Sequence, residues 1–229
     1  MCKNCGAALQ GGDEAALFLC AVCGTAYEPL DRELLGFRPL TASITTELAV
    51  GGDVRYLAFW RSAVVFAPTV LATESAWARL CKANAPRPVH MYIPAFTLAR
   101  AVVQRLGVSL AEAQPVLELT PGFAEEVSRR PSLVEVGSAH DPEPAEDGLV
   151  GPDFGTLSPV VVGRADSRIL ANFVFLALES HETPGICSVD YRLETSGEEL
   201  VFIPAVWDPR CVHDSNWRLL LREYDGLVA

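Results

Sequence analysis

The sequence of 229 residues predicts an α+β fold, in which a short cysteine-rich module precedes a body of helices and antiparallel strands. Half of the residues are hydrophobic and 21% are charged, which is the composition of a chain that buries a core. Some stretches repeat apolar residues at helical spacing, whereas others carry short apolar runs separated by glycine turns. A chain of this length can bury one large core or two modest ones.

The module at the N-terminus carries two Cys-x-x-Cys pairs, each followed by glycine. A two-residue spacing lets one tight turn aim both sulfur atoms at a single ion, and Gly6 and Gly24 permit the positive φ that such a turn needs. Two such turns bring four thiolates into the tetrahedron that zinc prefers. The predicted metal ligands are Cys2, Cys5, Cys20 and Cys23.

Residues 1–28 resemble a zinc ribbon, the small module of rubredoxin-type knuckles found in transcription factors, enzymes and assembly factors. The resemblance covers about an eighth of the chain and implies a structural Zn²⁺ within a module of residues 1–29. The same four ligands also suit iron, and a redox dithiol pair is the other alternative. A closed site of four sulfurs leaves no position for substrate, so it folds the module and does not catalyse.

Residues 30–135 are expected to form a first α+β half. Residues 37–48 and 54–60 flank the Gly-Gly-Asp of residues 51–53 and predict a hairpin. A helix is expected through Lys82, capped at Thr73 or Ser75.

Further along this half, residues 89–94 predict a strand and residues 95–106 a helix. Gly107 is expected to terminate that helix as a C-cap. Ser109 and Glu112 form a capping box, which predicts a separate short helix after it.

Residues 136–157 include an acidic, proline-rich run and are predicted to be a loop or linker. Residues 158–229 form the expected second α+β half. It contains a short strand at 159–162, a helix capped at Asp166 or Ser167, and a hairpin of residues 187–194 and 200–204 around Ser196 and Gly197. Residues 217–224 fit a strand or a short helix equally well.

The two predicted hairpins resemble each other, and an aromatic-Ile-Pro-Ala phrase occurs at both 92–95 and 202–205. This similarity suggests two related halves, with coincidence as the alternative. Proline removes a donor from a strand, so each of these strands is expected to lie at a sheet edge or to end at its proline. At an exposed edge a partner strand can add, or the protein's own loops can cover it.

No catalytic motif accompanies the metal module. The histidines lack the spacing of a zinc protease, and phosphate-binding or nucleophile-elbow patterns are absent from the sequence. Cys81, Cys187 and Cys211 are expected to be plain buried thiols. Glu179 and its neighbours to Glu182 are interpreted as a solvated helix end. An enzyme without a local signature stays an alternative.

The net charge of −11 disfavours a general nucleic-acid binder, because such proteins draw affinity from cationic side chains on phosphates. No apolar run reaches the roughly 20 residues that cross a bilayer. With no secretory signal and an odd cysteine count, we expect a cytoplasmic protein. The favoured function is an accessory or interaction protein that binds another protein, as an assembly factor or complex subunit. A nucleic-acid-linked ribbon protein and an enzyme are the alternatives.

Overall fold

The computed structural model confirms the α+β class, with three helices and two sheets among the residues it describes. These residues are 1–43, 54–68, 76–98, 100–122, 157–182, 191–208 and 211–213. The predicted acidic loop and the tail at 217–224 lie outside them.

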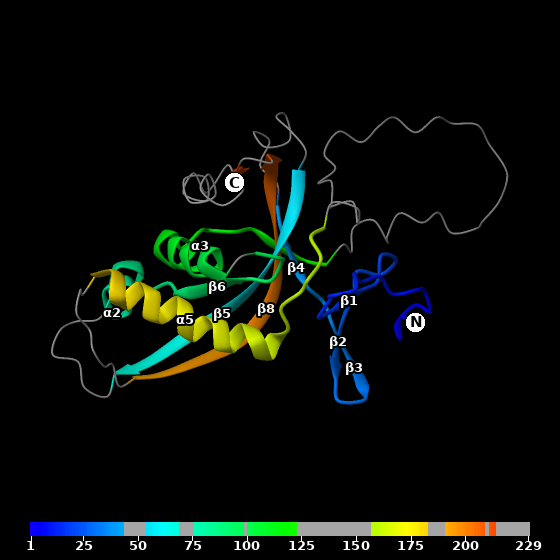
Figure 1. The fold of residues 1–229 in the computed structure, drawn as a ribbon, viewed down its shortest axis with the longest axis horizontal. Helices are drawn as coiled ribbons and strands as arrows, with labels where there is room; N and C mark the ends of the chain where they lie inside the picture. The colour runs from blue at the N-terminus through cyan, green and yellow to red at the C-terminus, as the bar shows by residue number, and fades with distance from the viewer. Residues whose placement is uncertain are drawn as a thin grey trace.

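The smaller sheet belongs to the N-terminal module and contains three antiparallel strands. They are β1 (Phe18–Leu19), β2 (Ala26–Leu30) and β3 (Glu33–Phe37), in the order β1-β2-β3. β1 and β2 lead into and out of the second cysteine pair. A two-residue turn at Asp31 and Arg32 joins β2 to β3, and this hairpin extends away from the helices (Figure 1).

The larger sheet forms the centre of the body, in the order β6-β5-β8-β4-β7, with β9 paired to β8. Its strands are β4 (Leu40–Ala42), β5 (Val54–Pro68), β6 (His90–Pro94), β7 (Leu119–Pro121), β8 (Tyr191–Asp208) and β9 (Cys211–His213). β5 and β8 are antiparallel partners along almost their whole lengths, so strands from both sides of residues 136–157 share one sheet.

The strands that the structure describes do not form the first predicted hairpin, and residues 44–53, with its turn, lie outside the described residues. β4 does not pair with β5; it pairs antiparallel with β7 and parallel with β8. β8 lies between β4 and β5 in the sheet. A local glycine turn indicates where the chain reverses, but it does not determine which distant strand becomes the neighbour.

The second predicted hairpin is also wrong, because β8 is one continuous strand. Gly197 has φ of 64°, yet it forms an irregularity in the strand and not a reversal. Between the pairs Arg61–Glu199 and Ala63–Ser196, β5 advances by two residues and β8 by three. The extra residue is a β-bulge, and glycine suits its left-handed conformation as well as it suits a turn. The similarity of the two hairpins therefore no longer supports a duplication.

The two aromatic-Ile-Pro segments flank β5 on opposite sides. β6, which ends at Pro94, is an edge strand as predicted, but Pro204 lies within the inner strand β8, which is a correction. Pro204 is opposite Tyr56, whose carbonyl accepts a hydrogen bond from Ser158 on the side away from β8. This pair therefore exchanges no ladder bonds, and β8 accommodates the missing N–H.

The three described helices are α2 (Ala76–Asn84), α3 (Arg100–Ala113) and α5 (Arg164–Glu182). α2 and α5 occupy the predicted stretches, although α5 begins before Asp166. α3 runs through Gly107, so the predicted C-cap and the second short helix are wrong. A Cβ at Gly107 would lie 2.5 Å from Val174 Cγ2 of α5, so this glycine allows two helices to approach closely.

The core lies on both faces of the large sheet, because side chains of β5 alternate between them. Trp60 and its alternate neighbours pack with Val174 and Phe175 of α5, which crosses in front of the strands in Figure 1. Phe59 faces the other way and packs with Leu106 of α3.

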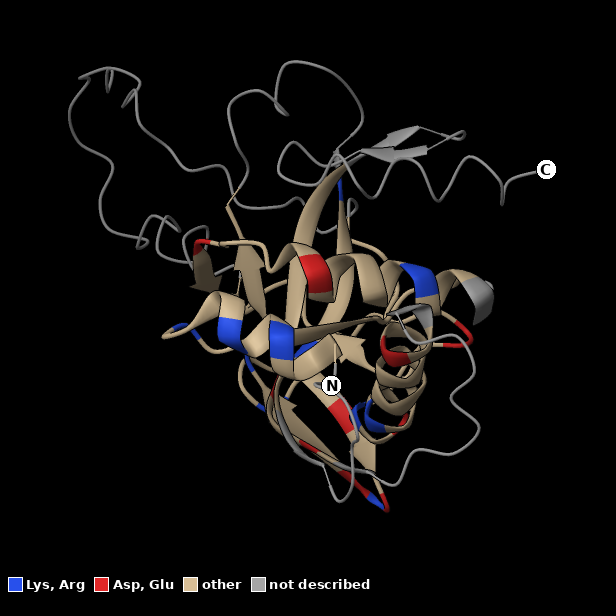
Figure 2. Cartoon of the chain, turned by 90° about the vertical axis from the view of Figure 1, so that its left-hand side faces the viewer, with Lys and Arg blue, Asp and Glu red and all other residues tan. Residues whose placement is uncertain are grey.

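Figure 2 shows cationic and anionic positions interspersed over the helices on the side it presents.

Two further sets of hydrogen bonds tie neighbouring segments to β6 and to the residue after it. The predicted strand at 159–162 is an extended connector, in which the N–H of Val161 donates to the carbonyl of Ala95 at 2.7 Å. The Gln114 side chain accepts from the N–H of His90 and donates to its carbonyl, which satisfies the edge of β6 at its first residue. Among the described residues, no helix is long and apolar enough to cross a membrane.

Candidate metal centre

The four predicted metal ligands meet at one point. The sulfur atoms of Cys2, Cys5, Cys20 and Cys23 all lie within 4.8 Å of one another. Two of these separations are 3.5 Å, from Cys2 to Cys23, and 3.4 Å, from Cys5 to Cys20. Tetrahedral zinc–sulfur bonds of about 2.3 Å place sulfurs about 3.8 Å apart, so this donor set fits an ion with small adjustments.

The backbone explains why the two pairs match. In each pair the glycine N–H donates to the carbonyl of the first cysteine, from Gly6 to Cys2 and from Gly24 to Cys20, both at 2.9 Å. The first cysteine's own N–H then donates to the residue after the glycine. Gly6 has φ of 76° and Gly24 has φ of 67°, as the sequence predicts. Both turns therefore aim their sulfurs by the same local geometry.

Two hydroxyl groups contact the sulfurs from β2 and the residue before it. Tyr27 Oη lies 3.2 Å from Cys2 Sγ, and Thr25 Oγ1 lies 3.2 Å from Cys23 Sγ. The N–H of Asn4 donates to Tyr27 Oη, which leaves the phenol proton directed at the sulfur. Such hydrogen bonds orient metal ligands and stabilise their thiolate form.

The thiols differ in acidity. Burial alone would raise the pKa of Cys2, but hydrogen bonds from Tyr27 and from the backbone of Cys5 and Asn4 lower it to about 6. A backbone hydrogen bond from Ala7 would lower the pKa of Cys5, yet desolvation and the neighbouring thiols raise it to about 12. Four thiolates this close repel one another unless a cation lies between them.

Tyr27 also fixes the strand beside it. A Cβ at Gly36, its partner on β3, would lie 2.9 Å from Tyr27 Cε1, so the phenol ring covers this glycine. Tyr27, Cys2 and Cys20 are buried together in a small cluster. The sulfurs therefore lie in a small buried cluster that is separate from the core of the body.

The metal module is joined to the body by Glu28, the next residue of β2. Glu28 Oε1 accepts the backbone N–H of Arg164 at 2.8 Å, at the first residue of α5, and Oε2 lies 3.5 Å from Arg164 Nε. The guanidinium lies over the rings of Phe37 of β3 and Trp60 of β5, at 5.0 and 5.3 Å. A carboxylate on the module thus caps a helix of the body.

The residues interpreted as a solvated helix end require one correction. Glu179 is buried, and its carboxylate oxygens accept the backbone N–H groups of Ala76 at 3.1 Å and Trp77 at 3.0 Å. It therefore caps α2 from α5. Cys81 is half-buried and burial raises its pKa, in keeping with a plain thiol. Cys187 lies outside the described residues.

Comparison of the chain with protein-family models, curated proteins and solved structures finds no match.

Sequence reasoning found the four cysteines and missed the groups around them. Tyr27, Thr25 and Glu28 lie just after the second cysteine pair, where the sequence analysis assigned no role. The available signal was the alternation of side chains along an extended segment. Thr25 and Tyr27, two residues apart, share the face toward the sulfurs, whereas Glu28 lies on the face toward the body. Arg164 gave no local signal.

Proposed function

We propose that this chain is a zinc-ribbon interaction protein, in which a structural Zn²⁺ on Cys2, Cys5, Cys20 and Cys23 stabilises a module that binds another protein. The observation that carries the proposal is the closed set of four sulfurs, supplied entirely by the chain. A metal held by four protein ligands has no coordination position for substrate. The ion's contribution is therefore to folding, which it couples to the body through Glu28.

The hairpin of β2 and β3 supports the interaction role. Leu30 is 59% exposed and Leu35 is 46% exposed, although both belong to the strands of this hairpin. The hairpin extends away from the helices (Figure 1). Exposed leucines on a small rigid element are typical of a contact surface.

The metal is tested by elemental analysis of the full chain purified without added metal. We expect about one zinc per chain and little iron. The Cys20→Ser variant should lose the zinc, whereas Cys81→Ser is a matched control that should retain it. Iron in place of zinc, or equal zinc in both variants, would contradict the metal assignment.

The partner is tested by isolating the tagged chain from its own cells at native abundance and identifying crosslinked proteins. We expect a partner that is lost when Leu30 and Leu35 are both replaced by serine. Val116→Ser is the control, because Val116 is 76% exposed but lies far along the chain from the hairpin. Recovery of the chain alone would argue against an interaction role.

A further inference from the structure

The outer edge of β3 carries backbone groups that point away from the module. Leu30 and Glu33 flank the two-residue turn, so this pair exchanges backbone hydrogen bonds. Every second pair along the hairpin does the same, and the next is Glu28 with Leu35. Leu34 and Gly36 fall between those pairs and direct their N–H and C=O groups outward. Pro29, opposite Leu34, confirms the register, since it has no N–H to place in the ladder.

Within the described parts of the chain, most of these outward groups lack a partner. The Leu34 carbonyl accepts a hydrogen bond from Lys3 Nζ at 3.2 Å. The Leu34 N–H and both backbone groups of Gly36 have no hydrogen bond to any described residue. The outer edge of β6, in the larger sheet, differs at His90, whose backbone groups both bond to Gln114. β3 is thus an open sheet edge.

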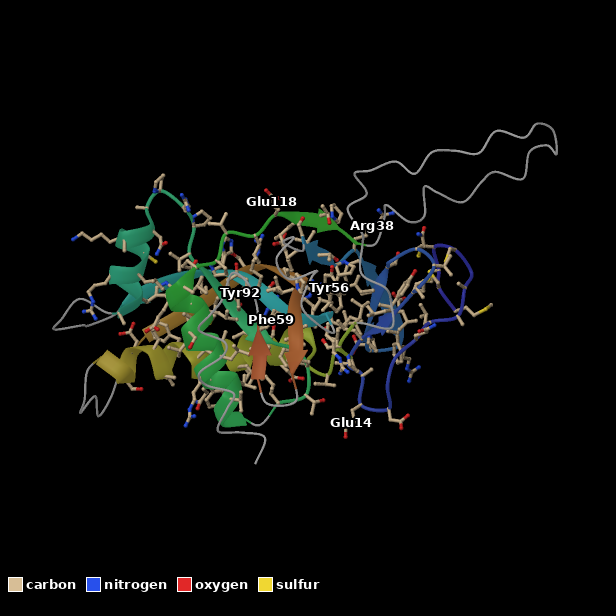
Figure 3. The ribbon with its side chains drawn as sticks, turned by 90° about the horizontal axis from the view of Figure 1, so that it is seen from above. Glu14, Arg38, Tyr56, Phe59, Tyr92 and Glu118 are labelled. Atoms are coloured by element: carbon tan, nitrogen blue, oxygen red, sulfur yellow. The ribbon has the colours of Figure 1, made fainter. Side chains whose placement is uncertain are left out.

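A groove of about 400 Å³ lies between the first cysteine pair and β3. Lys3 and Arg38 contribute its charges, Tyr27 and Phe37 its aromatic surface, and none of the described residues that line it is acidic. The whole chain has a net charge of −11, so this local cationic surface departs from its surroundings. Figure 3 places Arg38 and the acidic Glu14 on opposite sides of the module.

We propose that the open edge of β3 binds an extended, acidic segment of a partner protein as an added strand. The segment's backbone would pair with the N–H of Leu34 and with both backbone groups of Gly36, and its carboxylates would contact Lys3 and Arg38. This inference rests on the proposed function, because it specifies the chemistry of the partner.

Charge distinguishes this occupant from a second copy of the chain. Pairing β3 with β3 would bring two cationic grooves together, and like charges facing each other oppose association. An acidic strand instead supplies backbone partners for the open edge and negative charges for Lys3 and Arg38.

The test uses the full zinc-loaded chain and a fluorescein-labelled peptide of about ten alternating valine and glutamate residues, with a valine–lysine peptide for comparison. We expect fluorescence anisotropy to report binding of the glutamate peptide alone, weakened about tenfold by Arg38→Glu. Arg32→Glu is the matched control, because it makes the same charge change in the exposed turn outside the groove, and it should change the affinity less than about twofold.

Amide hydrogen exchange measured by NMR provides a readout that charge attraction alone would not change. The glutamate peptide should protect the amides of Leu34 and Gly36 about tenfold or more, and leave the already paired Leu35 unchanged. Absent binding, equal weakening by both variants, or binding without this protection would each overturn the inference. Zinc content measured on the same sample separates the outcomes, since a zinc-free chain would instead refute the proposed function.

Discussion

Replacement of Glu28 by alanine tests whether the metal module stabilises the body. The carboxylate accepts the first backbone N–H of α5 and contacts the guanidinium of Arg164. The two side chains are 14% and 28% exposed, respectively, so water replaces the lost contacts only in part. The substitution removes both interactions and leaves Arg164 over the rings of Phe37 and Trp60 without its carboxylate.

The expected loss in the free energy of unfolding is about 2 kcal/mol. Loss of a helix N-cap costs about 1 kcal/mol, and leaving a partly buried cation without its ion-pair partner costs about 1–3 kcal/mol. We take the low end of the second range because Arg164 retains some access to water. The Glu28→Gln variant keeps an oxygen acceptor for the N–H and should lose only about 1 kcal/mol.

Urea unfolding followed by tryptophan fluorescence measures the effect, since Trp60 lies at the junction. For a chain of this length, about 2 kcal/mol corresponds to a melting temperature lower by about 4–8 °C. Glu33→Ala is the control, because Glu33 is exposed on the same hairpin and should change stability by less than about 0.5 kcal/mol. If Glu28→Ala is as stable as this control, the module does not stabilise α5 in this way.

Three other perturbations test separate parts of the structure. Tyr27→Phe removes the hydrogen bond to the sulfur of Cys2, a ligand of the proposed zinc, and should weaken zinc affinity about 10–100-fold in chelator competition; an unchanged affinity would remove Tyr27 from the centre. Gly107→Ala places a methyl group against Val174 and should cost about 1–3 kcal/mol in urea unfolding, unlike a true C-cap glycine, whose replacement would fray only the helix end. Arg168 lowers the pKa of Glu198, so this ion pair stabilises the fold above the usual glutamate pKa. The free energy of unfolding of wild type should exceed that of Glu198→Gln by less and less as pH falls through the lowered pKa. A difference in unfolding free energy that does not change with pH would contradict this.

The sequence predicted the clustering of the four cysteines well because the geometry of each pair is local. A two-residue spacing and a following glycine determine each turn, so Gly6 and Gly24 could be assigned their positive φ without knowledge of the fold. The second set of contacts could not be assigned in this way. Glu28 and Arg164 are 136 residues apart, and no periodicity relates them.

The sequence alone determined the α+β class, the four cysteines and the positions of α2, α5 and β6, because turn chemistry and apolar spacing act over a few residues. The tertiary structure decided which strands are neighbours and what each glycine does. The sequence predicted that Gly107 ends a helix and that Gly197 lies in a hairpin turn, yet Gly107 allows two helices to touch and Gly197 allows a bulge in a long strand. Glycine is compatible with a helix end, a helix interior, a turn and a bulge. Which of these forms depends on the segment that packs against the glycine, and that segment is distant in sequence.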